Sequence, residues 1–368
     1  MHQQNRRNFL KASGAAALAG ALPLDSALAA GEPLVVGFIY PGPGNDYGWN
    51  QGHAQAAAKI KKMPGVKVLE EENVPETVQV QQAMEGMILQ DGAKLIFATS
   101  YGYLDPHVLK MAEKYPKVRF VWAGVWGPGK RPPNVGSVWG FIDQLGYLGG
   151  VVAAQMSKTK KLGWVAAKPV PQVLIDINAF TLGARSVDPA ITTRLIFTGD
   201  WWLPIKEAES ANALMDQGCD VVACDSQSPR VVVETAEKRG VMTLGYHVNQ
   251  ADLAPKGYLT GMEWDWATPY ALHIKAMQQN KPMVNVMRGG LKEGFVKASP
   301  FGTSVTPAAK TRASEIKARM LAGKYPIFKG EVKNNKGGVA IPAGEVHEQP
   351  DPVLDGMNYL VDGVQGQI

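Results

Sequence analysis

The sequence has little of what enzymes, metalloproteins and nucleic-acid binders need. Its six histidines, at positions 2, 53, 107, 247, 273 and 347, do not show the spacing of zinc ligands. It contains neither a Gly-x-Ser-x-Gly turn nor a Walker phosphate loop. The net charge of +5 is spread thinly apart from one dense basic run at 158–161, whereas a nucleic-acid surface gathers Lys and Arg on one face. These absences argue against catalysis, against a metal or other cofactor, and against nucleic acid as a partner.

Cysteine and long apolar runs are equally scarce. Cys219 and Cys224 are the only cysteines, and in an extended strand they would lie roughly 16 Å apart, at about 3.3 Å per residue. A disulfide needs Cα atoms within about 7 Å, so both are expected to be free, buried thiols. No cysteine lies near residue 30 to carry a lipid, and no run approaches the roughly 18 apolar residues of a membrane span. We therefore expect a soluble mature chain with no direct membrane anchor.

The N-terminus has the pattern of an export signal. Asn5–Lys11 contains the twin arginine followed by Phe and Leu, and a weakly hydrophobic stretch extends from Ala12 to Leu24. The sequence Ala-Leu-Ala at 27–29 offers the small residues that signal peptidase recognises. Residues 1–29 are therefore predicted to be a twin-arginine-type signal peptide, cleaved near Ala29. A soluble, unanchored exported protein is retained where an outer membrane encloses it, which predicts a periplasmic location.

From residue 33 onward, short apolar runs alternate with helical stretches. Strands are predicted at 34–40, 66–69, 94–98, 119–125, 161–166, 193–198, 220–224 and 241–245, with helices between them. This alternation is typical of α/β proteins, and the two series of strands predict two doubly wound parallel-sheet domains joined by a glycine-rich segment. A strand at 258–262, a helix at 268–278, a β-type region at 289–298 and a helix at 307–321 follow, and residues 329–349 are predicted to be a polar loop.

The last elements are expected to complete one domain and then the other, so that the chain crosses between them several times. The total of 368 residues suits two domains of roughly 150 residues each. We assign residues 30–140 plus about 263–300 to domain I. Residues 141–262 plus about 301–345 are assigned to domain II, and 346–368 form a C-terminal segment.

Tryptophan is concentrated where a ligand would bind. In open parallel sheets ligands lie beyond the carboxyl ends of the strands, and seven of the nine tryptophans fall at or beside predicted strand ends, namely residues 49, 122, 126, 201, 202, 264 and 266. Stacking of a base on an aromatic ring contributes about 1–3 kcal/mol, and polar neighbours fix its orientation. The alternative is that individual tryptophans merely cap the sheets as part of the core. The candidate ligand-binding residues are Trp49, Asn50, Tyr101, Trp122, Trp201, Asp225, Ser226, Tyr246, His247 and Trp264.

Six short motifs occur in the order found in one protein family. They lie at 46–52 (Asp-Tyr-Gly-Trp-Asn-Gln-Gly), 134–138 with 149–154, 218–222, 253–255, 290–294 and 300–301. Together they resemble the basic membrane protein (Bmp) family of ABC-transporter substrate-binding proteins, whose best-known members bind purine nucleosides. The resemblance covers nearly the whole mature chain. It implies the type I periplasmic-binding-protein fold, a hinge between the domains, and an ABC permease in the inner membrane as partner.

The resemblance also implies roles for single residues. Trp49 stands where the family has a Phe that stacks on the purine, Asn50 stands where an Asn lies beside it, and Trp201 matches a second stacking aromatic. Hinge closure would bring Trp49, Asn50 and Tyr101 of one domain against Trp201, Asp225 and Tyr246 of the other.

Three positions depart from the family pattern. The charged groups that hold the ribose hydroxyls in nucleoside binders are replaced by Gly124, His247 and Trp264. Ribose hydroxyls buried without partners would cost about 1–3 kcal/mol each. The sequence therefore predicts a purine-like ligand, with a free base such as adenine preferred over its nucleoside. Three alternatives remain open: a sensory or adhesive surface protein, an extracytoplasmic nucleoside hydrolase, and a sugar binder that uses the same cleft.

Overall fold

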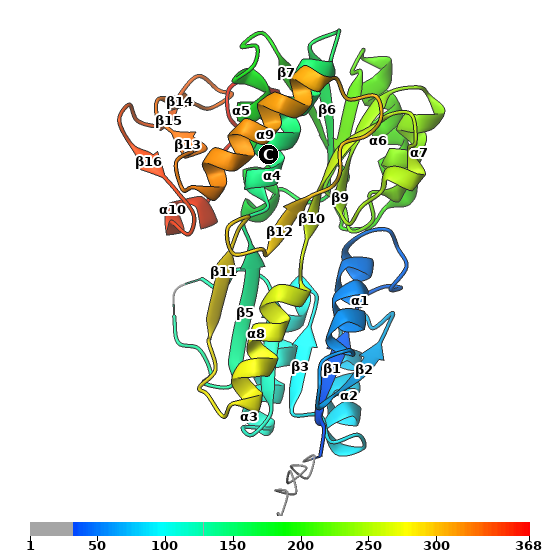
Figure 1. The fold of residues 1–368 in the computed structure, drawn as a ribbon, viewed down its shortest axis with the longest axis vertical. Helices are drawn as coiled ribbons and strands as arrows, with labels where there is room; N and C mark the ends of the chain where they lie inside the picture. Colours follow the sequence, from blue (N-terminus) through cyan, green and yellow to red (C-terminus); the bar gives the residue numbers. More distant parts are fainter. Residues whose placement is uncertain (1–31, 128) are drawn as a thin grey trace, which may run out of the picture.

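The computed structural model describes residues 32–127 and 129–368, and the predicted signal peptide lies outside this range. The described chain forms two α/β lobes, one above the other in Figure 1, each built on its own sheet. Within the described ranges, no helix is both long enough and apolar enough to cross a bilayer. Cys219 and Cys224 are buried and unpaired, as predicted.

The lower lobe in Figure 1 contains a parallel six-stranded sheet of order β11-β5-β4-β3-β1-β2. Its strands are β1 (Leu34–Ile39), β2 (Val66–Glu71), β3 (Leu95–Ala98), β4 (Arg119–Ala123), β5 (Val135–Gly140) and β11 (Val286–Gly289). The helices of this lobe are α1 (Trp49–Ile60), α2 (Val78–Leu89), α3 (Leu109–Lys114) and α8 (Ala267–Gln278), with short turns η1 (Tyr101–Tyr103) and η2 (Leu104–Val108).

Alternating side chains of β1 explain how helices cover both faces of this sheet. Phe38 packs against Phe97 and Tyr270, with ring centroids 4.8 and 5.7 Å away, on the side of α1 and α8. Its neighbour Ile39 belongs to a separate core cluster with Val80 of α2. Because successive residues of a strand point to opposite faces, an almost continuous apolar run is buried on both sides.

The upper lobe contains a seven-stranded sheet of order β12-β10-β9-β8-β6-β7-β17, in which β12 alone runs antiparallel to its neighbour. Its strands are β6 (Lys161–Ala166), β7 (Thr192–Phe197), β8 (Val221–Cys224), β9 (Met242–His247), β10 (Tyr258–Trp264), β12 (Val296–Ala298) and β17 (Val364–Gln365). Its helices are α4 (Asp143–Met156), α5 (Pro171–Arg185), α6 (Pro204–Asp216), α7 (Arg230–Lys238) and α9 (Pro307–Leu321), with a short turn η3 (Ala251–Leu253).

The glycine-rich segment expected between the two series is instead a strand and a buried helix. β5 completes the first sheet, and α4 packs closely on α5. A Cβ on Gly150 would lie 2.0 Å from the carbonyl oxygen of Phe180, and one on Gly183 would lie 2.1 Å from that of Tyr147. These glycines therefore permit close contact between two helix backbones, a requirement that depends on tertiary packing.

Two further expectations differ from the structure. The single β-type region at 289–298 is two strands, β11 in the first sheet and β12 in the second. The segment 329–349 is not an irregular loop, because it forms two small antiparallel sheets that pair β13 (Phe328–Lys329) with β16 (Val346–His347) and β14 (Val332–Lys333) with β15 (Val339–Ile341). A short helix, α10 (Pro352–Asp355), follows.

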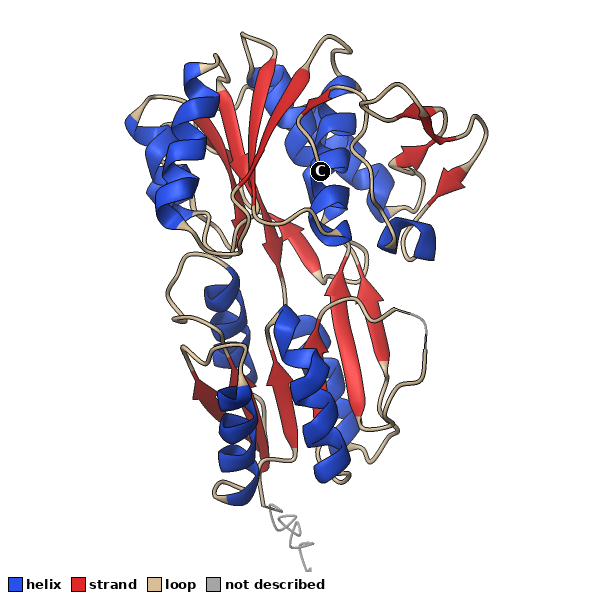
Figure 2. Ribbon diagram, turned by 180° about the vertical axis from the view of Figure 1, so that it is seen from behind, coloured by secondary structure: helices blue, strands red, loops and turns tan. Residues whose placement is uncertain are grey.

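Three segments of the described chain connect the lobes: β5 to α4, β10 to α8, and β11 to β12. All three run side by side through the narrow middle of the molecule, which Figure 2 shows from behind. The sheets place β12 with the upper lobe, although residues to about 300 were assigned to domain I. The exact domain boundaries remain a prediction.

Candidate ligand-binding site

A cavity of about 300 Å³ lies where loops from the carboxyl ends of both sheets face each other. The lower lobe contributes residues that follow β1, β3 and β4, and the upper lobe contributes residues that follow β7 and β8 and the last two residues of β9. A larger hollow of about 600 Å³ lies over β2 and α2, but it has no aromatic lining. The smaller cavity is therefore the candidate site, since it combines aromatic rings with a few polar groups.

Seven of the ten predicted residues line this cavity: Trp49, Tyr101, Trp201, Asp225, Ser226, Tyr246 and His247. They come from both lobes, so the structure brings together side chains that lie up to about 200 residues apart in sequence. Asn50, Trp122 and Trp264 are buried behind the lining instead.

Asn50 is occupied in holding the loop before α1. Its Nδ2 donates to Asp46 Oδ2 at 2.7 Å, and its Oδ1 accepts from the Gly42 amide at 3.3 Å. Asp46 also accepts from the amides of Gly48 and Gln51, at 2.8 and 2.9 Å. This carboxylate thereby satisfies amides at the start of α1 that have no partner inside the helix. The Asp and Asn of the motif at 46–52 build the turn that presents Trp49.

Trp122 and Trp264 support the site from behind. The Trp122 indole donates to the carbonyl of Ser100 at 2.8 Å, which fixes the loop after β3. The Trp264 ring stacks on Trp266, with centroids 4.7 Å apart and planes inclined by 12°. Both side chains are buried, and they position residues that line the cavity without lining it themselves.

Several lining residues are absent from the predicted ligand-binding set, among them Trp139, Gln172 and Trp202. Trp139 lies at the end of β5, a strand that was predicted as part of the joint, so the strand-end rule was not applied to it. Gln172 begins α5, and no pattern singled it out. Trp202 was recognised as a strand-end tryptophan, and 55% of its surface is exposed at the cavity mouth.

Trp49 lies at the centre of an aromatic cluster. Its ring centroid is 5.2 Å from that of Trp266, 5.5 Å from that of His247 and 6.1 Å from that of Trp139. Its indole N–H donates to the carbonyl of Thr99. The ring is thus fixed by edge-to-face packing and one hydrogen bond, and it presents a preformed face to a flat ligand.

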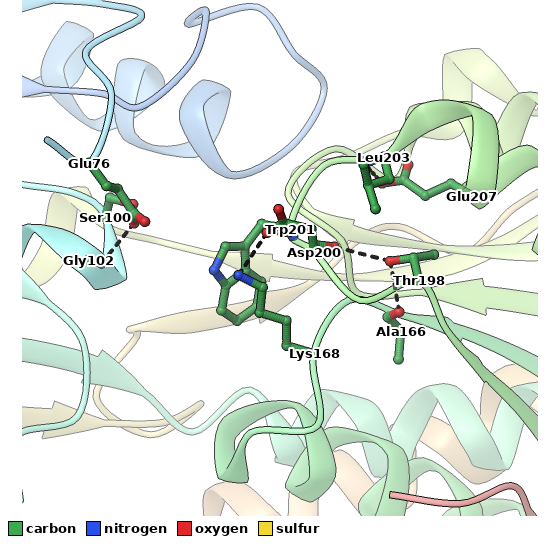
Figure 3. Close-up of polar contacts among 10 residues, drawn as sticks. All are labelled: Glu76, Ser100, Gly102, Ala166, Lys168, Thr198, Asp200, Trp201, Leu203 and Glu207. Carbon is green, nitrogen blue, oxygen red and sulfur yellow. Dashed lines mark hydrogen bonds and ion pairs between the residues drawn. The ribbon is translucent and has the colours of Figure 1, made fainter.

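Tyr101 and Trp201 face each other from opposite lobes, with ring centroids 6.4 Å apart. Trp201 is held on its own lobe by Lys168, whose Nζ lies 5.3 Å from the ring centroid, and Lys168 is paired with Asp200 at 2.7 Å (Figure 3). On the other side, Glu76 accepts from the Ser100 hydroxyl at 2.5 Å and from the Gly102 amide at 2.8 Å. Polar contacts therefore set the positions of the aromatic loops on both sides.

The His247 ring is neutral and has no free nitrogen. Its Nε2 donates to the carbonyl of Ser226 at 2.9 Å, and its Nδ1 accepts from the Trp264 indole at 3.2 Å. Burial lowers the pKa of His247 to about 3. Its φ of 74° is a left-handed conformation that is strained for a side chain with a Cβ, and the two hydrogen bonds help to hold it. The imidazole therefore offers a ligand its ring surface.

Two buried carboxyl groups, those of Asp176 and Asp225, lie on the side of the cavity that the upper lobe forms. The Tyr246 hydroxyl donates to Asp176 Oδ2 at 2.8 Å, and Asp225 is 4% exposed. Burial raises the pKa of Asp225 to about 8, and burial together with the nearby Asp225 raises that of Asp176. Within the described ranges, no cluster of three His, Cys, Asp or Glu residues could hold a metal ion.

The fold and the position of this cavity agree with one family of known proteins. Residues 34–329 match the family Bmp, described as "ABC transporter substrate-binding protein PnrA-like". The chain belongs to the Bmp family. The family assignment predicted from the sequence motifs is therefore confirmed, and so is a two-lobed α/β fold of the periplasmic-binding-protein type.

Relatives of this Bmp protein span most of its length. A purine-binding protein of Brucella abortus is 36% identical over 347 residues, which cover 94% of this chain and 97% of the relative. A putative ABC transporter glucose-binding protein of Haloferax volcanii is 27% identical over 338 residues, covering 92% and 82%. A solved solute-binding protein of an ABC transporter from Conexibacter woesei is similar in fold, with a TM-score of 0.64, 22% identity, and coverage of 79% of this chain and 97% of that one.

Membership of the Bmp family settles the general role and the location. The chain is a substrate-binding protein of an ABC transporter, which implies a small-molecule ligand and a permease partner. Residues 3–23 match the twin-arginine translocation signal, so the protein is exported to the periplasm, as predicted. The family consists of solute-binding proteins rather than enzymes. The cleavage point near Ala29 remains a prediction.

Proposed function

We propose that this substrate-binding protein captures a purine base, such as adenine, and delivers it to an ABC importer. The observation that carries the proposal is the aromatic lining of the cavity, in which Trp49, Tyr101, Trp139 and Trp201 surround a space of about 300 Å³. Flat rings stack favourably on such faces. The printed name of the Brucella abortus relative, a purine-binding protein, supports the same ligand class.

The surroundings of Gly124 support a base over a nucleoside. A Cβ at this position would lie 2.2 Å from the Trp122 ring, so an acidic side chain there would require Trp122 to move. At the other two departures from the family pattern, His247 has both nitrogens engaged and the Trp264 indole donates to His247. These three positions therefore offer no free acceptor, so a ribose placed against them would leave its hydroxyls unpaired and would bind less tightly.

Calorimetry with purified mature protein tests this proposal. We expect adenine to bind at least tenfold more tightly than adenosine, because two or more ribose hydroxyls would lose hydrogen bonds to water. Tighter binding of adenosine would refute the preference for a base. Binding of glucose with no binding of purines would refute purine transport and favour a sugar ligand. Release of adenine from adenosine by the pure protein would instead indicate a hydrolase.

A further inference from the structure

Several polar groups at the cavity already have partners within the protein. The Trp49 indole, the Tyr246 hydroxyl and both nitrogens of His247 are hydrogen-bonded to described residues. On the rim, Glu76 accepts from Ser100 and Gly102. These groups fix the aromatic rings in place and have little capacity left to recognise a ligand.

Two lining residues carry buried side-chain oxygens that remain available. Both carboxyl oxygens of Asp225 and the Oε1 of Gln172 are buried, and none of the three atoms has a hydrogen bond of ordinary geometry among the described residues. The Trp164 indole and the Ala167 amide lie near Asp225 and favour its ionised form, but the Trp164 indole N–H also lacks a hydrogen bond of ordinary geometry. Burial raises the pKa of Asp225 to about 8, so its two oxygens both act as acceptors above that pH, or where a donor or cation on the ligand favours the ionised form. An unsatisfied buried acceptor costs free energy that a donor on the ligand would recover. Asp225 comes from the loop after β8 and Gln172 from the start of α5, so they approach the cavity from two elements of the same lobe.

The charges around the cavity all have one sign. Its described lining contains Glu76, Asp200 and Asp225 but no Lys or Arg. The nearest base, Lys168, is tied to Asp200 at 2.7 Å and lies against the Trp201 ring. Behind Asp225 lies a further acid, Asp176, whose partner is the Tyr246 hydroxyl rather than a cation. A negatively charged ligand would therefore meet only acids and neutral groups, while a donor or cation would reduce the repulsion between them.

We propose that Asp225 is the residue that selects the ligand: the flat ring bound in the cleft is neutral or cationic and presents an N–H donor to this carboxyl, and anionic rings are excluded. This inference rests on the proposed function in placing a flat ring between the tryptophans. To that function the inference adds the charge of the ring and the role of Asp225, which would hydrogen-bond the edge of the ring.

Three flat probes of nearly equal size and shape test the proposal: benzamidine (cationic), benzamide (neutral) and benzoate (anionic). Dissociation constants would be measured at pH 9, above the pKa of about 8 for Asp225, for wild-type mature protein, for Asp225→Asn and for the control Asp252→Asn, with adenine as a fourth ligand. In the wild type we expect benzamidine and benzamide to bind and benzoate to bind at least tenfold more weakly. In Asp225→Asn the dissociation constant of benzoate divided by that of benzamidine should fall at least tenfold. The dissociation constant of adenine should rise at least tenfold. Asp252 is exposed in the same lobe and lies outside the cavity lining. Asp252→Asn removes the same charge and should leave the ratio of dissociation constants and the affinity for adenine within threefold.

The outcomes separate the two proposals. Benzoate binding as tightly as benzamidine, or unchanged ligand preference and adenine affinity in Asp225→Asn, would overturn the role of Asp225 even if adenine binds. Charge-ordered binding of the probes without any binding of adenine would support Asp225 and refute a purine ligand. A failure of all four ligands to bind would overturn both. Thermal unfolding checks that Asp225→Asn is folded. Its melting temperature should be at least that of the wild type, because the variant no longer buries an acid.

Discussion

The amide of Trp49 donates a 2.8 Å hydrogen bond to the carbonyl oxygen of Gln227, so the first residue of α1 is joined directly to the loop after β8 in the other lobe. The Ser228 hydroxyl donates to the carbonyl of Asp46 at 2.5 Å beside it, and the Gln250 side chain donates to the carbonyl of Tyr47. These contacts form a latch (residues 46–49 against Gln227, Ser228 and Gln250) next to the cavity. The loop that carries Trp49, the proposed stacking residue, therefore also joins the two lobes.

Gly48 is the point of closest approach in this latch. A Cβ there would lie 2.0 Å from the Gln227 carbonyl oxygen and 2.8 Å from the Ser228 Cα, both backbone atoms. Gly48→Ala should therefore prevent full closure and weaken ligand affinity at least tenfold. Small-angle scattering should show that the ligand no longer compacts the variant. The control is Gly86→Ala in α2, where a Cβ meets nothing within 4 Å and helix stability should rise by about 0.5–1 kcal/mol. Normal closure of Gly48→Ala would contradict the role of the latch.

Trp49→Ala should weaken binding of the purine ligand by roughly 5- to 150-fold, since stacking on one aromatic ring contributes about 1–3 kcal/mol. Trp49→Phe retains an aromatic face and should recover part of this loss. Calorimetry on both variants measures the effect. Trp126→Ala is the matched control, because Trp126 lies outside the cavity lining and packs against Arg131. Equal affinities of wild type and Trp49→Ala would remove this ring from the site.

Asp46→Ala should lower the free energy of unfolding by about 1–2 kcal/mol, a typical cost of losing a helix-capping side chain. The carboxylate accepts from three backbone amides and from the Asn50 side chain, so four donors lose their partner. Denaturant unfolding gives the value. Asp91→Ala serves for comparison, because Asp91 is half-exposed and lies 4.0 Å from Lys67, where an ion pair contributes little. A loss no greater than that of Asp91→Ala would show that the loop before α1 does not depend on Asp46.

The buried acids predict how stability changes with pH. Burial raises the pKa of Asp225 to about 8 and that of Asp143 to about 7, whereas both groups titrate near 4 in an unfolded chain. Between pH 4 and 7 the native state therefore holds protons that the unfolded state has released, and the free energy of unfolding falls as pH rises. Each group contributes a slope of up to about 1.4 kcal/mol per pH unit.

Asp225→Asn should remove one of these two slopes and raise the stability at pH 7, which chemical denaturation at several pH values would reveal. The buried histidines act in the opposite sense. Burial lowers the pKa of His247 to about 3 and that of His273 to about 4, so they reduce stability as pH falls below about 6.5. An unchanged slope in Asp225→Asn would contradict the assigned titration of this carboxyl.

The sequence pattern predicts the parallel sheets well because their strands are buried on both faces and their helices have regular lengths. It fails at α4, where the glycines at 149 and 150 suggest a flexible joint. Only the packing of Gly150 against the Phe180 carbonyl explains why glycine is needed within that helix. Local propensity favours a break there, and a tertiary contact between two helices overrides it.

The candidate site shows the same limit. Strand-end position correctly placed Trp49, Trp201 and Asp225 at one cavity. It could not distinguish a side chain that faces the ligand from one that supports the loop, as Asn50 does through Asp46 and Gly42. That distinction depends on side-chain hydrogen bonds between residues whose relative orientation follows from the folded loop. Trp139 was missed for a different reason, since the strand that carries it was not recognised.

The three connecting segments between the lobes restrict how the protein can open. A single linker would let the lobes rotate freely relative to each other. Three adjacent connecting segments resist twisting and sliding of the lobes, but they permit bending about an axis that runs across all three segments. We therefore expect opening to be mainly a bending motion, described by one angle between the lobes. A permease that contacts both lobes at once would bind differently at different angles between them. A protease that cuts one of the three segments would leave the two lobes attached.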